Sequence, residues 1–115
     1  MTAPGLVAAE LGPPLFLGAA RWSDLAGAVG DVPVAVVLTT FEAGAGTAWH
    51  RHRNPQVLVV SGGAGVLELP DEVVELTAGD VHVVPGGVRH RHAAGAGTGM
   101  THVSVSAAAD TELLA

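Results

Sequence analysis

Apolar residues occur along this chain in short runs that alternate with glycine- and proline-rich breaks. No stretch sustains a 3.6-residue apolar period beyond about three turns, so long amphipathic helices are not expected. The runs are rich in valine, and runs of this length and composition, bounded by turn residues, are typical of β-strands. We therefore predict strands over residues 15–17, 34–41, 57–60, 65–69, 73–76, 81–84, 90–93 and 100–106.

The breaks carry residues that favour tight turns, which places turns at residues 43–46, 61–63, 70–71, 78–80 and 85–87. One segment, 22–30, is compatible with a short helix, with Ser23 as its N-cap and Gly30 as its end. The two ends of the chain, 1–12 and 107–115, are expected to be loosely held. Many short strands at regular spacing predict an all-β sandwich or a closed jelly-roll barrel.

Composition limits the kind of protein that this sequence encodes. Its 115 residues fit a single domain over 1–115, with a motif-bearing core at about 32–106. Hydrophobic residues reach 49% and charged residues only 14%, so an ordered core is expected despite a formal charge of −6. All five basic residues are arginine, against eleven acidic residues, which disfavours nucleic acid as a partner.

Export and membrane insertion are also disfavoured. The first twelve residues include Glu10 and no basic residue, so we expect no signal peptide. The apolar run at 32–38 is far shorter than the roughly 20 residues that span a bilayer. Cysteine is absent, which fits a cytoplasmic location.

The candidate chemistry lies in the histidines. Lysine and cysteine are absent, which removes Schiff-base and thiol catalysis, whereas all six histidines lie between His50 and His102. Alternate residues of a strand share a face, so His50 and His52 point the same way, as do His90 and His92. Imidazole is a common ligand of transition metals, and two such pairs favour one metal site over solvated surface histidines.

The spacing of these residues resembles the two motifs of the cupin family. The first motif is matched by Gly44, His50, His52, Gln56 and Gly63, and the second by Gly79, Pro85, Gly86 and His90. The resemblance implies a single cupin jelly-roll barrel in which His50, His52, Gln56 and His90 bind one metal ion. Two positions depart from the pattern, because Gln56 replaces the usual glutamate and Ala94 replaces a frequent asparagine.

A narrower resemblance, over about residues 39–106, is to the bacterial manganese-dependent cupin hydroxynitrile lyases of the (R)-mandelonitrile lyase type. It is carried by residues 39–44, 47–52, Gln56, 79–81, Pro85, 90–92 and 100–102. That group also has a glutamine ligand, and the match implies that His92 and His102 are catalytic residues beside the metal. Arg91, Val83 and the Asn54-Pro55 step depart from the group, and we expect these departures to concern the substrate pocket.

Residue chemistry agrees with a lyase. A neutral Gln56 leaves the full charge on a divalent ion, which strengthens a Lewis acid and disfavours redox chemistry. A neutral imidazole at His92 or His102 is a competent base near neutral pH. The expected function is therefore cleavage or formation of small cyanohydrins. An iron-dependent cupin dioxygenase and a non-catalytic small-molecule or metal-binding cupin remain open.

Other expectations concern the metal, the assembly and the remaining side chains. Manganese is the first candidate, and iron, nickel and zinc also accept this ligand set. By fold analogy we expect a homodimer or homotetramer that acts on a small molecule. Strand alternation turns Arg51 and Arg91 away from the ligands and puts Trp49 on the same outer face, where an oligomer could bury it. We interpret His82 as a surface residue. Thr47 could line the pocket.

Overall fold

The computed structural model describes residues 9–10, 16–24, 34–107 and 111–113, and every regular element in these ranges is a β-strand. The strands are β1 (Ala9–Glu10), β2 (Phe16–Leu17), β3 (Ala20–Asp24), β4 (Ala35–Phe41), β5 (Gly46–Thr47), β6 (His50–His52), β7 (Gln56–Glu68), β8 (Val73–Thr77), β9 (Val81–Val84), β10 (Arg91–Ala94), β11 (Met100–Ser106) and β12 (Thr111–Leu113). None of these described segments forms a helix of the length and apolarity that crossing a membrane requires.

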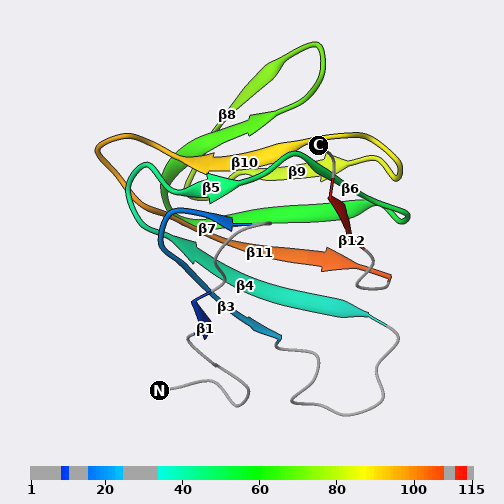
Figure 1. Cartoon of the computed structure of the whole chain (residues 1–115), viewed down its shortest axis with the longest axis horizontal. Helices are drawn as coiled ribbons and strands as arrows, with labels where there is room; N and C mark the ends of the chain where they lie inside the picture. The colour runs from blue at the N-terminus through cyan, green and yellow to red at the C-terminus, as the bar shows by residue number, and fades with distance from the viewer. Residues whose placement is uncertain (1–8, 11–15, 25–33, 108–110, 114–115) are drawn as a thin grey trace.

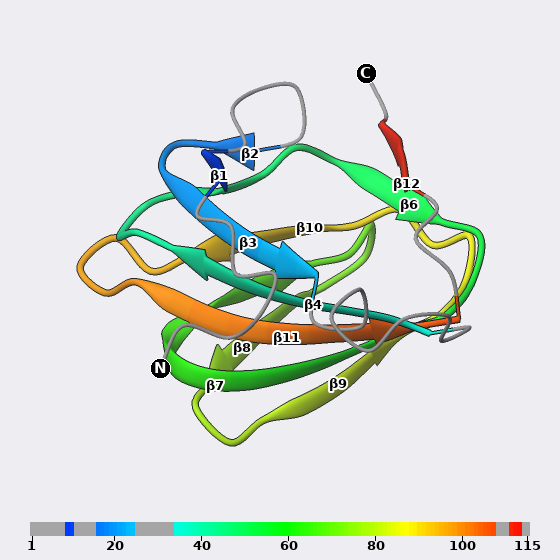
Figure 2. The same cartoon turned by 90° about the horizontal axis from the view of Figure 1, so that it is seen from below.

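The strands pair antiparallel and curl into a nearly closed barrel (Figure 1). The main sheet has the order β1-β3-β4-β11-β7-β10-β5-β2, and β8 and β9 both pair with β7. Seen from below, β3, β4, β11, β7 and β9 lie side by side as one layer (Figure 2). The expected all-β jelly-roll barrel is confirmed.

Strand β7 links the two layers of the barrel and corrects one prediction. The sequence suggested two strands with a turn at 61–63, whereas β7 runs unbroken from Gln56 to Glu68. Its register against β11 shifts at Thr101/His102, which is a β-bulge that bends the strand without ending it. Gly63 has φ +71°, and a Cβ there would overlap the carbonyl of Gly99. Glycine thus permits the bend that the sequence pattern mimics as a turn.

The barrel interior holds an apolar cluster at one end and polar side chains beside it. The buried apolar side chains are Ala20, Phe41, Ala45, Leu58, Val60, Leu67, Leu76, Val84, Ala94 and Met100. The buried polar side chains are Thr39, Thr47, His50, Gln56, His90, His92 and His102. Buried polar groups are costly unless they are bonded, so this grouping marks the part of the interior where a site is expected.

Three further predictions about local structure are wrong for the described residues. The proposed helix at 22–30 begins inside β3, which pairs with β4 from Ala20 to Asp24; residues 25–30 lie outside the described residues. Both ends also contribute strands, since β1 pairs with β3 and β12 pairs with β6. Weak local propensity is overridden here by long-range pairing, which a single-sequence pattern does not record.

Candidate metal centre

Three histidines meet at one point inside the barrel. His50 and His52 come from β6, and their shared face follows from strand alternation. His90 lies directly before β10 and forms a bridge with His50 through two backbone hydrogen bonds of 2.9 and 2.8 Å. Their ligand nitrogens all lie within 4.8 Å of one another, so these three side chains could hold a metal ion.

Hydrogen bonds to the backbone orient two of these rings. Nδ1 of His50 is 2.8 Å from the carbonyl oxygen of Ala48, and Nδ1 of His90 is 2.9 Å from that of Val88. A carbonyl oxygen only accepts, so each Nδ1 carries the hydrogen and each Nε2 keeps its lone pair. Ligating histidines are typically oriented in this way.

Three atoms at this end of the barrel are buried acceptors with no hydrogen-bond partner among the described residues. They are Nε2 of His52, Nε2 of His90 and Oε1 of Gln56. Gln56 is the first residue of β7 and is only 8% exposed. An orphaned buried acceptor is unfavourable unless a cation or donor satisfies it. Nitrogen and amide-oxygen donors of this kind suit a divalent transition metal.

Two further histidines extend the cluster into the barrel. The ring centroid of His92 lies 4.9 Å from that of His90 and 5.4 Å from that of His50. His102 on β11 follows at 5.0 Å from His92, and Phe41 packs on its other side at 5.3 Å. We call His50, His52, His90, His92 and His102 the histidine row.

The outer end of the histidine row also has unsatisfied nitrogens. His92 and His102 are each 3% exposed. Nδ1 of His92 and both ring nitrogens of His102 have no partner among the described residues. The interpretation of His102 as a solvated strand residue is therefore wrong: its pairing with the buried residues Thr39 and Val60 turns it inward.

Strand β5 fixes the backbone of His92. The hydroxyl of Thr47 accepts a hydrogen bond from the backbone N–H of His92 at 3.0 Å, and Arg91 Nε donates to the Thr47 carbonyl at 3.2 Å. This approach needs Gly46, where a Cβ would lie 2.6 Å from the carbonyl oxygen of His92. The sequence left the role of Thr47 open and did not identify Phe41, because both contacts join residues far apart in the chain.

A family model described as a cupin domain matches residues 37–105, which is more than half of the chain. The chain belongs to the cupin family. This cupin is 38% identical over 91 residues to an (R)-mandelonitrile lyase of Granulicella tundricola, covering 78% of this chain and 70% of that protein.

Solved structures agree with the fold of this cupin. A cupin-like protein from Thermotoga maritima superposes with a TM-score of 0.85 at 27% identity, covering 93% of this chain and 84% of that one. The polyketide cyclase RemF from Streptomyces resistomycificus superposes with a TM-score of 0.81 at 18% identity, covering 98% and 82%. The second likeness concerns the fold alone.

Burial keeps the histidine row of this cupin uncharged. Desolvation lowers the pKa of His50 to about 3 and the pKa values of His90 and His102 to about 4. It also places the pKa of His92 well below 6.5, and the neighbouring histidines lower it further. These four imidazoles are therefore neutral near pH 7, which is the form that binds a metal or accepts a proton.

The shifted pKa values predict that the metal-free protein loses stability in mild acid. Because the folded-state values lie below 6.5, the unfolded chain binds more protons as the pH falls from 6.5 towards 4. Each such histidine contributes a slope of about 1.4 kcal/mol per pH unit within its window, and none above it. Urea unfolding in EDTA at pH 7.5, 6.5, 5.8 and 5 measures the free energy of unfolding. An unchanged value between pH 6.5 and 5 would contradict this prediction.

Two departures from the lyase pattern lie outside the barrel interior. Val83 is 53% exposed on β9. Arg91 lies opposite Glu68 in the β10–β7 register and is 3.5 Å from its carboxylate, on the face opposite His92. The expectation that these departures alter the substrate pocket is therefore wrong for both residues. The other departure, Asn54-Pro55, lies in the connection between β6 and β7.

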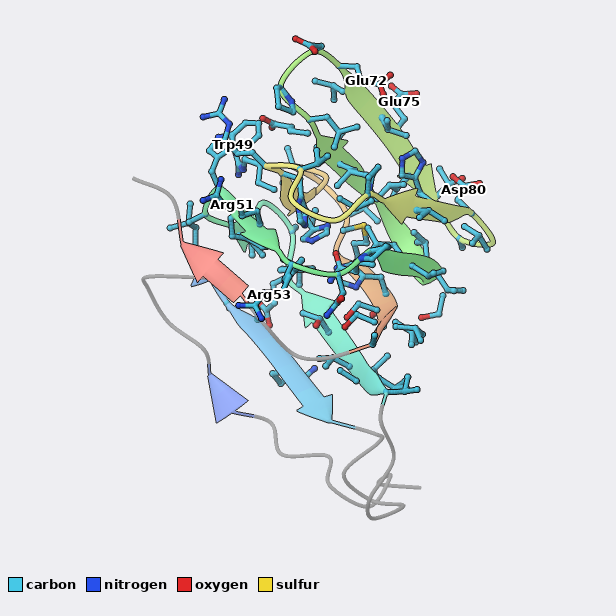
Figure 3. All side chains as sticks on the ribbon, turned by 90° about the vertical axis from the view of Figure 1, so that its right-hand side faces the viewer. Trp49, Arg51, Arg53, Glu72, Glu75 and Asp80 are labelled. Carbon is cyan, nitrogen blue, oxygen red and sulfur yellow. The ribbon has the colours of Figure 1, made fainter. Side chains whose placement is uncertain are left out.

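The expected orientation of the remaining cationic and aromatic residues is confirmed in part. Arg51 is exposed between His50 and His52. Trp49 is half-buried, with the Arg89 guanidinium 4.9 Å from its ring centroid. Figure 3 shows Trp49, Arg51 and Arg53 towards one side of the barrel and Glu72, Glu75 and Asp80 towards the other. Burial of Trp49 in an oligomer stays a prediction.

His82 is not the surface residue that the sequence suggested. It pairs with the buried residue Leu58 and alternates with the exposed residues Val81 and Val83, so it lies on the inner side of β9 and is half-buried. The assignment of an inner face to the two valines misled the prediction, because β9 carries apolar residues on both faces.

Proposed function

We propose that this cupin is a divalent-metal lyase that cleaves or forms small cyanohydrins. The observation that carries the proposal is the histidine row, where catalytic candidates His92 and His102 adjoin the three histidines that could hold a metal. The 38% identity to an (R)-mandelonitrile lyase supports the same substrate class. A carboxylate is absent from the buried polar residues of the described interior, as expected for a site that attracts an anion such as cyanide.

His50, His52, His90 and Gln56 are the residues that would hold the metal. Their orphaned acceptor atoms fit a cation, and the Nδ1 hydrogen bonds of His50 and His90 hold the rings in the ligating tautomer. When bound, the ion would supply Lewis-acid polarisation of the substrate hydroxyl. We propose manganese as the native metal; iron, nickel and zinc accept the same ligands.

His92 and His102 would carry the proton. An open imidazole nitrogen removes the hydroxyl proton of the cyanohydrin, and the oxygen electrons form the carbonyl double bond. The bond to the nitrile carbon breaks, and its electron pair leaves with cyanide. The imidazolium then returns the proton to give hydrogen cyanide and an aldehyde or ketone. Burial assists this cycle because it disfavours the charged ring, so that the proton is released again.

Cyanide release from mandelonitrile tests the proposal. Tag-free protein loaded with Mn²⁺ is expected to release cyanide steadily, to stop in EDTA and to recover when Mn²⁺ is restored. The background reaction without protein is measured at the same pH, because cyanohydrins decompose in base. Oxygen uptake by the iron-loaded protein with an aromatic diol would favour a dioxygenase. Metal binding without either activity would indicate a non-catalytic cupin.

The cellular context of this activity is proposed from the sequence. The site fits a small molecule as substrate, and neither nucleic acid nor a membrane is expected as a partner. The cytoplasmic location stays a prediction. The expected homodimer or homotetramer is taken up next, from the outer surface of the barrel.

A further inference from the structure

Strand β11 presents its polar residues inward and its apolar residues outward. His102 and Ser104 lie on the side of β11 that faces the barrel, opposite the buried residues Val60 and Leu58. Val103 and Val105 alternate with them and lie on the outer surface. An antiparallel strand between a core and water normally shows the reverse arrangement. The histidine row explains the polar inner face, but it does not explain the apolar outer face.

The neighbouring strands continue this apolar outer face in register. One row crosses four strands from β9 to β4 through Val81, Val59, Val103 and Leu38. A second row crosses the same strands through Val83, Val57, Val105 and Val36. Each of these side chains is half-buried or exposed, and Val81 and Val83 are 62% and 53% exposed. We call these eight residues the valine face; Figure 2 shows the four strands side by side.

The valine face is large enough to be the centre of an interface. Four strands spaced about 4.8 Å apart, over seven residues at about 3.3 Å each, cover roughly 440 Å² of flat sheet. This area matches the largest apolar patch on a typical monomer, which is often functional. It is more than half of the roughly 800 Å² that each partner buries in a standard interface, before a polar rim is counted.

Charge indicates what could cover this face. Two copies of a chain with a formal charge of −6 repel each other, so they associate most readily through surfaces that lack charge. The valine face contains no charged residue, whereas Val73, which is equally exposed on β8, lies beside Glu72 and Glu75. A uniform aliphatic surface is complementary to itself, which is what a two-fold contact requires.

We propose that the valine face is the interface of a homodimer in which the β4-β11-β7-β9 layers of two copies pack face to face. Antiparallel sheets pack in this way at about 10 Å, with strand directions within about 30° of each other. The dimer leaves the histidine row on the inner face of each barrel. This interface is independent of the proposed lyase activity, because none of its residues belongs to the site.

Light scattering coupled to size exclusion tests the dimer with the full chain. The wild type is expected at about 23 kDa, twice the chain mass of 11.5 kDa. The double variant Val81→Lys, Val83→Lys is expected at the monomer mass, with a dissociation constant raised at least tenfold. The matched control is Val73→Lys, Leu17→Lys, which alters two residues of similar exposure (63% and 45%) outside the face. It is expected to remain dimeric.

Two further measurements separate face packing from the alternatives. Val103→Lys lies in the middle of the face and not on the edge strand, so it is expected to dissociate the dimer while keeping the β-type circular dichroism spectrum. Mixing the Lys double variant with Val81→Glu, Val83→Glu is expected to restore the dimer mass. A monomeric wild type would overturn the proposal and indicate a different partner or coverage by the chain itself. A dimer that survives both Lys variants would overturn it as well.

Discussion

Replacing His90 by alanine is expected to abolish stoichiometric metal binding. His90 contributes one of the three clustered ligand nitrogens, and its backbone bridges to His50. With one imidazole gone, the remaining donors no longer enclose a cation, and the affinity for Mn²⁺ should fall at least 100-fold. Changes to groups that merely orient ligands already reduce affinity 10- to 100-fold. Elemental analysis of tag-free protein and calorimetric titration with Mn²⁺ measure the effect.

His82→Ala is the matched control for that variant. His82 is also a half-buried histidine of the barrel, but it lies on β9, outside the clustered ligands. Its metal content should equal that of the wild type. The assignment of His90 would be wrong if the two variants bound metal equally well, provided that both give the wild-type circular dichroism spectrum.

Replacing His102 by alanine is expected to lower the turnover of mandelonitrile by about 10² to 10⁴-fold while the metal content stays at the wild-type level. A positioned acid–base group contributes a factor of this size. His102 is separated from the clustered ligands by His92, so its loss removes a proton acceptor without removing a ligand. Cyanide release under substrate saturation measures turnover, and elemental analysis measures the metal.

A conservative variant separates proton transfer from packing. His102→Gln retains a polar side chain of similar size against Phe41, but it does not titrate, so its activity should be as low as that of His102→Ala. The pH dependence that belongs to this imidazole should disappear in both variants. A Gln variant with wild-type turnover would show that His102 acts only as a packing residue, whatever the alanine variant does.

The metal ligands were recognisable from the sequence because they depend on short-range order. His50 and His52 share a strand face by alternation, and His90 follows a turn that residues 85–87 specify locally. Their convergence confirms the expected grouping as a site that could hold a metal, and the cupin fold was predicted from the same spacings. Gln56 as fourth ligand and the catalytic roles of His92 and His102 remain proposals that the variants test.

Other features were mispredicted because distant segments decide them. Ser61 and Gly62 have the residue types of a turn, yet pairing of β7 with β11 absorbs them as a bulge. Trp22 begins a plausible helix by local propensity, but the backbone at this position pairs with β4. In each case the hydrogen bonds of a long-range ladder outweigh a local preference of a fraction of a kcal/mol per residue.

Alternation along each strand thus determined which residues share a face, and with it the two histidine pairs and the all-β class. Only the tertiary structure decided which of two faces is the inner one. On β9 and β11 both faces carry apolar residues or the polar residues point inward, so hydrophobicity does not identify the interior. The pairing partners do: Leu58 places His82 inward, and Thr39 and Val60 do so for His102. Register is a property of the closed barrel, because shifting one strand by one residue would exchange its faces.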